Sequence, residues 1–259
     1  MKIGYDLGYG YAKLVYGRDY QVKVFPSVLA KADQFADDGR GFGDYTLQID
    51  GEKYYVGNAA LLSKSKLLLS AFDGNRINNK VFYDLFLAGI ASCIKYDDEE
   101  IYVATGLPIS AYKAHRKEIA QYKGKHITCL NNKALRLNLA EIMVIPQPLG
   151  TYFKLLNAYP ELKRQSILIV DIGFKTTDLF RIEQDIPLPS STTLHFGMSD
   201  IARDVIDYAN GRIDGKTYTI NQADDILDNG FIVNGKRQFI PEEIQVNSLR
   251  NVFNAIWAR

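Results

Sequence analysis

One short pattern occurs twice in this chain and limits what it can fold into. In each copy a β-rich run ends in an aspartate, an apolar residue and a glycine, and a second β-rich run then returns. The first copy is centred on Asp6, and the second follows 165 residues later at Asp171. A strand, a tight glycine turn and a second strand form a hairpin, and an internal repeat at this spacing indicates two related domains. We therefore expect an α/β fold of duplicated domains that face one ligand cleft.

Hydrophobic periodicity and turn residues place the other elements. Strands are expected at Lys2–Tyr5, Ala12–Tyr16, Gln21–Phe25, Tyr45–Ile49, Lys53–Val56, Ile101–Thr105, Lys125–Leu130, Leu135–Leu139, Ile142–Ile145, Ser166–Asp171, Thr177–Ile182 and Ser190–His195. Helices are expected at Lys80–Ile94, Ala111–Tyr122, Pro148–Leu156, Met198–Ala209, Asn221–Asp228 and Pro241–Ala258. The acidic stretch Asp33–Asp44 predicts a loop. The domain boundary is expected near Tyr159-Pro160, which gives a first domain over residues 1–159 and a second over 160–259.

The two hairpins have the chemistry of a phosphate clamp. The first hairpin runs Asp6-Leu7-Gly8-Tyr9-Gly10-Tyr11-Ala12-Lys13, and the second runs Asp171-Ile172-Gly173-Phe174-Lys175-Thr176-Thr177-Asp178. Phosphate binding needs backbone N–H donors that approach closely, and glycine permits both the approach and the tight turn. An aspartate at a strand end can hold Mg²⁺, usually through its water shell. Lys13, on the returning strand, brings an ammonium within reach of the β- and γ-phosphates.

A single hairpin of this kind is an ordinary turn, so the inference depends on the duplication. The phosphate loop Gly-x-x-x-x-Gly-Lys-Ser/Thr does not occur, and Lys13 interrupts the dinucleotide fingerprint Gly-x-Gly-x-x-Gly. The hairpins therefore predict a nucleotide site of a different type.

Composition excludes several other classes of protein. The net charge is +1, so the totals give no electrostatic basis for direct nucleic-acid or membrane binding. The three histidines share no metal spacing with Cys93 or Cys129, and two cysteines indicate reduced thiols rather than a disulfide framework. No stretch is long and apolar enough for a membrane segment, so a cytoplasmic protein is expected. The basic run Lys113–Lys125 is either a solvated helix face or a filament or partner contact.

Both hairpin motifs, in this order, resemble those of the superfamily of actin, sugar kinases and DnaK-type chaperones. Within it the chain looks most like the ParM-like bacterial and archaeal actins. The resemblance spans about the first 180 residues. Besides the hairpins it rests on three segments, Phe25-Pro26-Ser27, Thr105-Gly106-Leu107-Pro108 and Val144-Ile145-Pro146-Gln147-Pro148.

The resemblance implies a role for each matching residue. It implies an actin-like, ribonuclease-H-like fold that binds ATP or ADP with Mg²⁺ and hydrolyses ATP. Gln147 and Asp171 are the implied catalytic residues, because the family places a Gln or Glu that orients the attacking water just before a helix. Asp6 and Asp171 are the implied Mg²⁺ ligands, through water. The implied nucleotide-binding residues are Asp6, Gly8, Tyr9, Gly10, Tyr11, Lys13, Gly173, Phe174, Lys175 and Thr176.

The chain departs from the family pattern at two places. The second hairpin has Gly173-Phe174-Lys175-Thr176 where the family often has Gly-Gly-Thr-Thr, and Lys175 points either to the phosphates or to solvent. The chain ends in a helix near Arg259, without the family's last strand and glycine-rich adenosine motif. We expect either a truncated second domain or a different adenine pocket, with Asn221–Leu227 resembling the subdomain that flanks the base.

Fold alone does not determine function, so three functions stay open. The first is a Mg-ATPase that self-associates into cytoskeletal filaments and positions DNA or another cargo, as in plasmid partition, with a DNA-bound adaptor as partner. The second is a small-molecule kinase with Asp178 as base. The third is a regulatory nucleotide-binding module with little turnover.

Overall fold

The computed structural model describes residues 1–32, 45–63, 68–73, 76–77, 79–97, 99–213 and 217–258. The segment Asp33–Asp44, for which the sequence predicts a loop, lies outside the described residues. Within them, no helix is both long and apolar enough to cross a membrane.

Contacts divide the chain into two compact units. Unit 1 comprises Met1–Ile169 and Phe180–Thr192, and unit 2 comprises Val170–Leu179 and Thr193–Arg259. The predicted domain boundary near Tyr159-Pro160 stays a prediction. The two units are defined by contacts, and contacts do not test which segments form two related domains.

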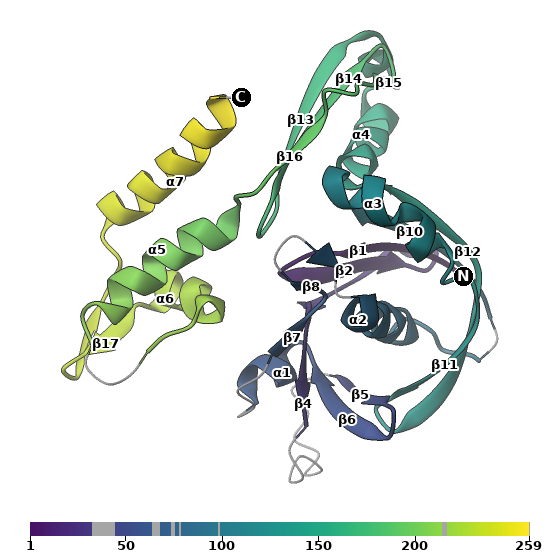
Figure 1. Cartoon of the computed structure of the whole chain (residues 1–259), viewed down its shortest axis with the longest axis horizontal. Helices are drawn as coiled ribbons and strands as arrows, with labels where there is room; N and C mark the ends of the chain where they lie inside the picture. Colours follow the sequence, from purple (N-terminus) through teal and green to yellow (C-terminus); the bar gives the residue numbers. More distant parts are fainter. Residues whose placement is uncertain are drawn as a thin grey trace. The chain divides into compact units, whose positions relative to one another are not determined.

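Unit 1 is built on a sheet of ten strands that curls around a helix (Figure 1). In spatial order the strands are β3 (Gln21–Pro26), β2 (Tyr11–Tyr16), β1 (Lys2–Leu7), β10 (Glu100–Leu107), β12 (Lys133–Pro146), β11 (Gly124–Leu130), β5 (Tyr45–Ile49), β6 (Glu52–Val56), β4 (Val28–Lys31) and β7 (Leu68–Ser70). The first three strands along the chain form an antiparallel meander, whereas β1, β10 and β12 are parallel. The ends of parallel strands gather at one edge of a sheet, where α/β proteins bind ligands.

Strand β1 is held in place by helix α2 (Asn79–Ala91), which lies in the concave side of the curled sheet (Figure 1). The Tyr5 hydroxyl donates a hydrogen bond of 2.8 Å to the Leu85 carbonyl, and its ring stacks on Phe86. Gly89 permits this approach, because a Cβ at Gly89 would overlap the Tyr5 hydroxyl. Burial, with smaller contributions from Cys93 and Asp6, raises the pKa of Tyr5 well above its usual range. The hydroxyl therefore stays protonated and donates its hydrogen bond. This bond holds β1 in place at the residue next to Asp6.

Two helices follow the ends of parallel strands. Helix α3 (Ile109–Ala120) begins after β10, and helix α4 (Gln147–Ala158) begins directly after β12. Pro148 lies in the first turn of α4, where the missing N–H costs nothing. Gln147 is consequently the first residue of a helix at the edge where β1 also ends.

A second sheet follows, and the division between the units passes through its first two strands. Its strands are β13 (Ser166–Ile172), β14 (Thr177–Glu183), β15 (Ile186–Pro187) and β16 (Thr192–Leu194). In unit 1, Ile169 and Phe180 from this sheet pack with Ile109 and Tyr152. The second hairpin of the sequence is the connection between β13 and β14.

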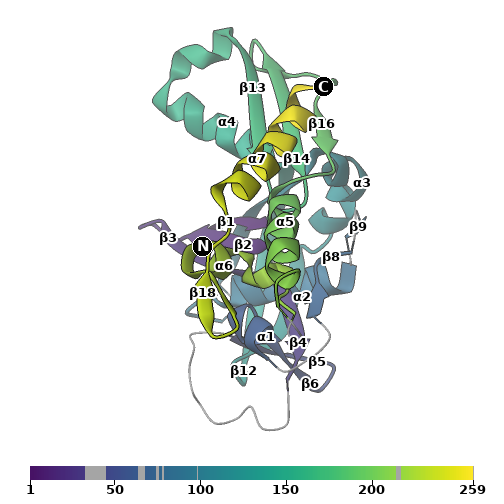
Figure 2. The same cartoon turned by 90° about the vertical axis from the view of Figure 1, so that its left-hand side faces the viewer.

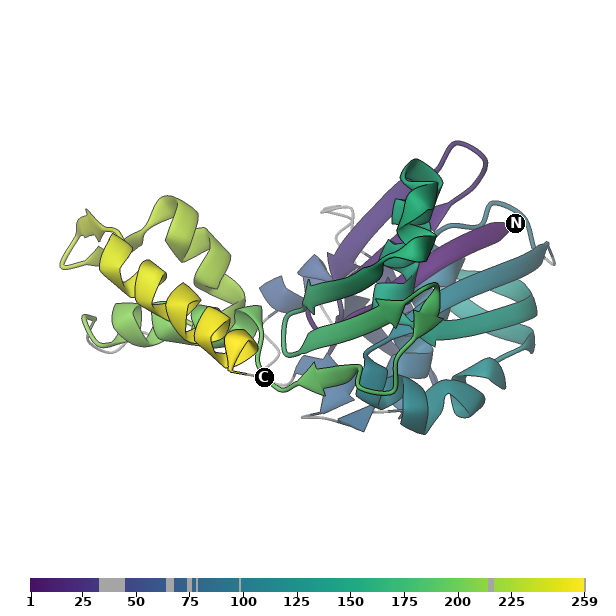
Figure 3. The same cartoon turned by 90° about the horizontal axis from the view of Figure 1, so that it is seen from above.

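Unit 2 consists mainly of helices. They are α5 (Met198–Asn210), α6 (Ala223–Asn229) and α7 (Glu242–Trp257), with the hairpin β17 (Phe231–Val233) and β18 (Lys236–Gln238) between the last two. Helices α5 and α7 lie side by side (Figures 2 and 3), joined by a hydrogen bond of 2.6 Å from the Ser248 hydroxyl to Asp204. A cluster that includes Val205, Ile226 and Phe231 forms the core of this unit.

Several short elements have no predicted counterpart. They are α1 (Asn58–Leu62), β4, β7, β8 (Phe72–Asp73), β9 (Arg76–Ile77), β15, β17, β18 and the 3₁₀ turns η1 (Pro160–Arg164) and η2 (Ile220–Gln222).

Most of the predicted strands and helices are confirmed, but the division of one strand is wrong. Leu135–Leu139 and Ile142–Ile145 form the single strand β12 of 14 residues rather than two strands. The register shifts opposite Ile101 and Tyr102, so a β-bulge at Ala140 absorbs the break in alternation. The strand expected at Ser190–His195 is shorter than predicted, at Thr192–Leu194.

Candidate functional site

The first hairpin is a tight turn between β1 and β2. The Gly8 amide donates a hydrogen bond of 3.1 Å to the Tyr11 carbonyl, which closes the turn. A Cβ at Gly8 would lie 3.1 Å from that carbonyl oxygen, a close approach that favours glycine. The Gly10 carbonyl accepts a hydrogen bond of 2.9 Å from the Ser27 amide, and the Gly10 amide has no acceptor among the described residues. The turn is thus closed by its own backbone, and the Gly10 amide can donate to another acceptor.

Two side chains converge on the Asp6 carboxylate. The Gln147 side-chain amide donates a hydrogen bond of 2.6 Å from Nε2 to Asp6 Oδ1. Lys13, the partner of Asp6 across the β1–β2 ladder, places Nζ at 3.7 Å from Oδ2. These contacts bring three of the predicted residues together at the end of β1. With Nε2 engaged, the Gln147 Oε1 is left as an acceptor for water, given this orientation of the amide.

Gly106 sets the position of Gln147, a role that the sequence motifs do not predict. Gly106 lies near the end of β10, and a Cβ there would lie 2.7 Å from Gln147 Cγ and 3.2 Å from its Cα. Any larger residue at 106 would therefore move the side chain that contacts Asp6. The signal in the sequence is a glycine within an otherwise β-rich buried strand, which marks a close approach.

Two buried hydroxyls flank the first hairpin. Ser27 and Thr105 are 0% and 1% exposed, and within the described part of the chain neither hydroxyl has a hydrogen-bond partner. The Ser27 amide holds Gly10, and Thr105 pairs with Tyr5 beside Asp6. An unsatisfied buried hydroxyl is uncommon and costs about 1–3 kcal/mol. Both residues belong to segments that carry the family resemblance.

The second hairpin repeats the backbone turn of the first. The Gly173 amide donates a hydrogen bond of 2.8 Å to the Thr176 carbonyl, and a Cβ at Gly173 would lie 3.0 Å from that oxygen. Asp171 lies near the end of β13 and is half-buried, like Phe174 and Lys175 at the turn. The recurrence seen in the sequence is thus also a recurrence of backbone structure.

The start of α5 fastens the second hairpin. The Met198 amide donates a hydrogen bond of 3.0 Å to the Gly173 carbonyl, and the Ser199 amide donates one of 2.6 Å to the Phe174 carbonyl. Gly197 packs against this backbone so closely that a Cβ would overlap the Gly173 carbonyl oxygen and lie 2.8 Å from that of Phe174. The first amides of α5 are therefore used by the hairpin. The sequence motifs do not predict this role of Gly197, although a glycine directly before a helix is a visible signal.

Asp178 lies at the end of the second hairpin in a buried environment. It is 2% exposed, and the Thr193 hydroxyl donates a hydrogen bond of 2.5 Å to Asp178 Oδ1. Thr177 is also buried and donates a hydrogen bond of 3.0 Å to the Phe196 carbonyl. These contacts tie β14 to β16 and to the segment before α5.

The described residues contain no group of three or more His, Cys, Asp or Glu that would hold a metal ion by itself. A divalent cation at Asp6 or Asp171 would take its other ligands from water and phosphate oxygens, as Mg²⁺ commonly does. The single carboxylates fit that mode of binding.

Comparison with known proteins identifies the family. The family described as the N-terminal domain of actin-like proteins matches residues 4–150, which is more than half of the chain. The chain belongs to the actin-like proteins. This match includes the first hairpin and Gln147. No curated protein sequence matches this actin-like chain.

Solved structures of low sequence identity share the fold of this actin-like chain. Ta0583, an archaeal actin homologue solved in complex with ADP, has a TM-score of 0.80 at 19% identity, over 99% of this chain and 81% of its own. A ParM in a 15-stranded filament from Clostridium botulinum has a TM-score of 0.78 at 23% identity, over 98% and 81%. AlfA, in a filament bound to AMPPNP, has a TM-score of 0.55 at 17% identity, over 100% and 98%. The predicted mixed α/β, actin-like fold is therefore confirmed.

Proposed function

We propose that this actin-like chain is a Mg-ATPase that assembles into filaments when it binds nucleotide. The observation that carries the proposal is the hydrogen bond of 2.6 Å between Gln147 and Asp6. It joins the side-chain amide of Gln147, which in this proposal orients the attacking water, to a carboxylate beside a glycine turn, in a chain of the actin-like family. Phosphoryl transfer to water needs mainly positioning and charge neutralisation, which these groups supply.

The nucleotide of the proposal is ATP or its product ADP. Among the structural relatives, Ta0583 was solved with ADP and the AlfA filament with AMPPNP. In this chain the phosphates would bind to the turns of the two hairpins, with Lys13 and Lys175 adding positive charge. The phosphate-binding residues of the proposal are Asp6, Gly8, Tyr9, Gly10, Tyr11, Lys13, Gly173, Phe174, Lys175 and Thr176.

The catalytic residues of the proposal are Gln147 and Asp171. Gln147 Oε1 would accept a hydrogen bond from the attacking water while Nε2 stays on Asp6. Asp6 and Asp171 would hold Mg²⁺ through water, and bound Mg²⁺ would neutralise the phosphate oxygens. Gly106 packs against Gln147, and the first amides of α5 hold the turn at Gly173 and Phe174. These contacts support a site that needs little rearrangement when nucleotide binds.

The biological role of the proposal is transport or positioning of cargo in the cytoplasm. Self-association is supported by the filaments of a ParM and of AlfA, which share this fold. Plasmid or other DNA would be the cargo, linked to the filament by a DNA-bound adaptor protein. The kinase alternative is less well supported, because its base Asp178 is 2% exposed and accepts a hydrogen bond from Thr193.

Sedimentation and light scattering with Mg-ATP, combined with a phosphate-release assay, test the proposal. We expect polymer in Mg-ATP, little polymer without nucleotide or with EDTA, and phosphate release that follows assembly. Release that occurs only after a sugar or other small acceptor is added would replace the proposal with a kinase. Nucleotide binding with neither polymer nor release would replace it with a regulatory module.

A further inference from the structure

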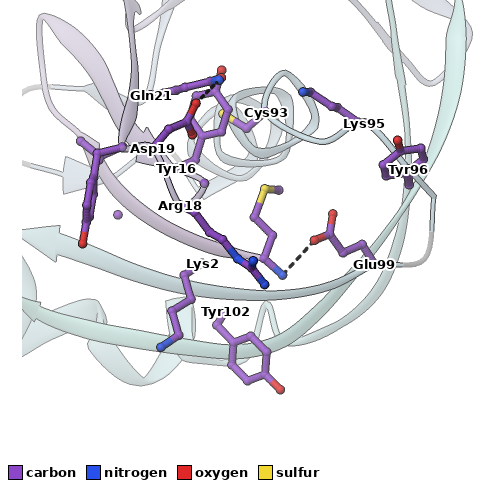
Figure 4. Close-up of a pocket in the computed structure, with 15 residues that line it drawn as sticks. Lys2, Tyr16, Arg18, Asp19, Gln21, Cys93, Lys95, Tyr96, Glu99 and Tyr102 are labelled. Carbon is purple, nitrogen blue, oxygen red and sulfur yellow. Dashed lines mark hydrogen bonds and ion pairs between the residues drawn. The ribbon is translucent and has the colours of Figure 1, made fainter.

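Unit 1 carries a hollow of about 940 Å³ at the end of the sheet away from the first hairpin. It lies between the turn that joins β2 to β3 and the segment that follows α2 (Figure 4). The cationic hollow is defined here by six of its lining residues, Lys2, Arg18, Tyr20, Lys95, Tyr96 and Tyr102. Lys2 is at the opposite end of β1 from Asp6, roughly 13 Å away at the usual strand rise. The hollow is therefore separate from the phosphate site that we propose at the first hairpin.

The tyrosines of the cationic hollow are unusually exposed. Tyr20 is 77% exposed, Tyr96 is 73% exposed and Tyr102 is 41% exposed. A site for a small molecule would enclose its ligand, whereas these rings stand out from the surface. Exposed tyrosine and arginine side chains are the residues that most often dominate protein–protein interfaces.

The backbone at Tyr20 is strained without any gain in packing. Tyr20 has a φ of 52°. The other residues with positive φ, apart from glycine, are Asp, Asn or Gln in the described part of the chain. A bulky aromatic residue rarely adopts this conformation, and such strain tends to be kept where a side chain has a function. Since the ring is exposed, burial in the core does not explain the conformation.

The positively charged groups that line the cationic hollow outnumber the two carboxylates that line it. Among the described residues, no carboxylate pairs with Lys2, Arg18 or Lys95. The two lining carboxylates have other partners: Asp19 accepts a hydrogen bond of 2.7 Å from Gln21, and Glu99 lies 3.2 Å from the terminal amine. In Figure 4 Arg18 extends into the hollow from the β2–β3 turn, with Lys95 and Tyr96 on the other side. The hollow therefore favours an acidic partner.

Unit 2 carries a surface of the opposite charge. Asp224, Asp225 and Asp228 are exposed on α6, at spacings that place them on one side of the helix. No cation in the described ranges pairs with them, although Asp225 accepts a hydrogen bond from Asn229. We call these three residues the acidic face of α6. Exposed apolar side chains follow it in the sequence, including Ile232 and Phe239.

We propose that the cationic hollow of one copy binds the acidic face of α6 of a second copy. The inference rests on the proposed filament function and adds which surfaces meet. The two surfaces differ, so the contact is heterologous, and such contacts build open filaments when the rotation between copies does not close a ring. Three cations meet three carboxylates, while the tyrosines supply the area excluded from water.

A charge-swap experiment tests the contact. The hollow variant carries Lys2→Glu, Arg18→Glu and Lys95→Glu, and the helix variant carries Asp224→Lys, Asp225→Lys and Asp228→Lys. Each variant alone would place like charges opposite one another, so we expect its critical concentration for assembly in Mg-ATP to rise at least about tenfold. In a 1:1 mixture every contact again joins opposite charges, so assembly should return to near the wild-type level.

The control has the same change in net charge at another surface. Lys113→Glu, Lys117→Glu and Lys123→Glu alter exposed positions of the basic run around α3, and they should leave assembly unchanged. Assembly lost in this control but kept in the hollow variant would move the interface to α3 and overturn the proposal. Circular dichroism would show whether each variant is folded. If a triple variant unfolds, Arg18→Glu and Asp225→Lys replace the triples, with an expected rise of about threefold each.

The remaining outcomes separate this inference from the proposed function. Wild-type filaments together with normal assembly of both charge variants would overturn the contact and leave the filament function intact. Loss of assembly in each variant without rescue in the mixture would also overturn it. Absence of wild-type polymer would overturn the filament function and the contact together.

Discussion

The two hairpins share one backbone hydrogen bond and differ in what surrounds it. In each, the glycine amide donates to the carbonyl three residues on, at 3.1 Å from Gly8 to Tyr11 and at 2.8 Å from Gly173 to Thr176. Around the first hairpin, side chains from β2 and α4 reach the carboxylate of Asp6. Around the second hairpin, backbone amides at the start of α5 hold the turn itself.

The last position of each hairpin shows the same contrast. Lys13 in the first hairpin is 60% exposed at its side chain and faces Asp6. Asp178, at the matching position of the second, is buried and accepts a hydrogen bond from Thr193. The same backbone turn thus has two different surroundings. In the first hairpin, charged and polar side chains meet at Asp6, whereas in the second hairpin the backbone of the turn is held in place.

If the second hairpin depends on its backbone being held in place, Gly197→Ala should reduce the stability of the protein more than any other substitution proposed here. The new Cβ would overlap the Gly173 carbonyl oxygen and lie 2.8 Å from that of Phe174, and backbone atoms cannot move aside as a flexible side chain can. We expect a loss of about 3 kcal/mol in the free energy of unfolding, from the overpacking and from weakened hydrogen bonds to α5. Urea denaturation would measure it, and ATP affinity should fall at least about tenfold.

Gly150→Ala is the matched control for that substitution. Gly150 lies in α4 with no atom within 4 Å of a new Cβ, so alanine should stabilise the chain by about 0.5–1 kcal/mol. A Gly197→Ala protein as stable as wild type would show that the start of α5 does not hold the second hairpin.

For the first hairpin the corresponding test is Gln147→Ala. It removes the amide that contacts Asp6, so ATP hydrolysis should slow by about tenfold to hundredfold while ATP binding changes little. Gly106→Ala should slow hydrolysis in the same way, because its Cβ would lie 2.7 Å from Gln147 Cγ and displace that side chain. Phosphate release at saturating ATP and an independent binding assay would separate the two quantities. Equal loss of binding and turnover in Gln147→Ala would remove its assigned role.

The residues that distinguish the hairpins show what a sequence can predict. Asp6 and Asp171 are visible because each follows a strand and precedes a glycine, a local pattern that the structure keeps. Pro148 likewise predicts the first turn of α4, and this places Gln147 at the start of a helix. These predictions succeed because neighbours in the chain determine turns and helix starts.

Contacts between distant residues are what the sequence did not reveal. Gly106 touches Gln147 across 41 positions, and Gly197 touches Gly173 across 24, so neither role can be read from local pattern. The pairing of Thr193 with Asp178 is hidden for the same reason. The predicted division of β12 into two strands is wrong because a bulge at Ala140 interrupts the alternation without ending the strand. Tertiary packing decides each of these cases.

The burial of Asp178 predicts a moderate effect in the second hairpin. Thr193→Val removes the hydroxyl that donates at 2.5 Å to a carboxylate with 2% exposure. Removing one partner of a buried hydrogen bond costs about 1–3 kcal/mol, so we expect the free energy of unfolding to fall by about 1.5 kcal/mol, measured by urea denaturation. Thr192→Val alters the exposed neighbouring position and should have almost no effect. Equal stability of the two variants would mean that Asp178 does not depend on Thr193.

The smallest effect on stability is expected at the matching position of the first hairpin. Lys13→Met breaks an ion pair of 3.7 Å between side chains that are 60% and 39% exposed. Water and salt screen such a pair, so the free energy of unfolding should change by less than about 0.5 kcal/mol. ATP affinity should nevertheless fall severalfold, and less so at high salt, because Lys13 is proposed to act on phosphate. A stability loss above about 1 kcal/mol with unchanged ATP affinity would make Lys13 a structural residue, and the contrast between the hairpins would then fail at this position.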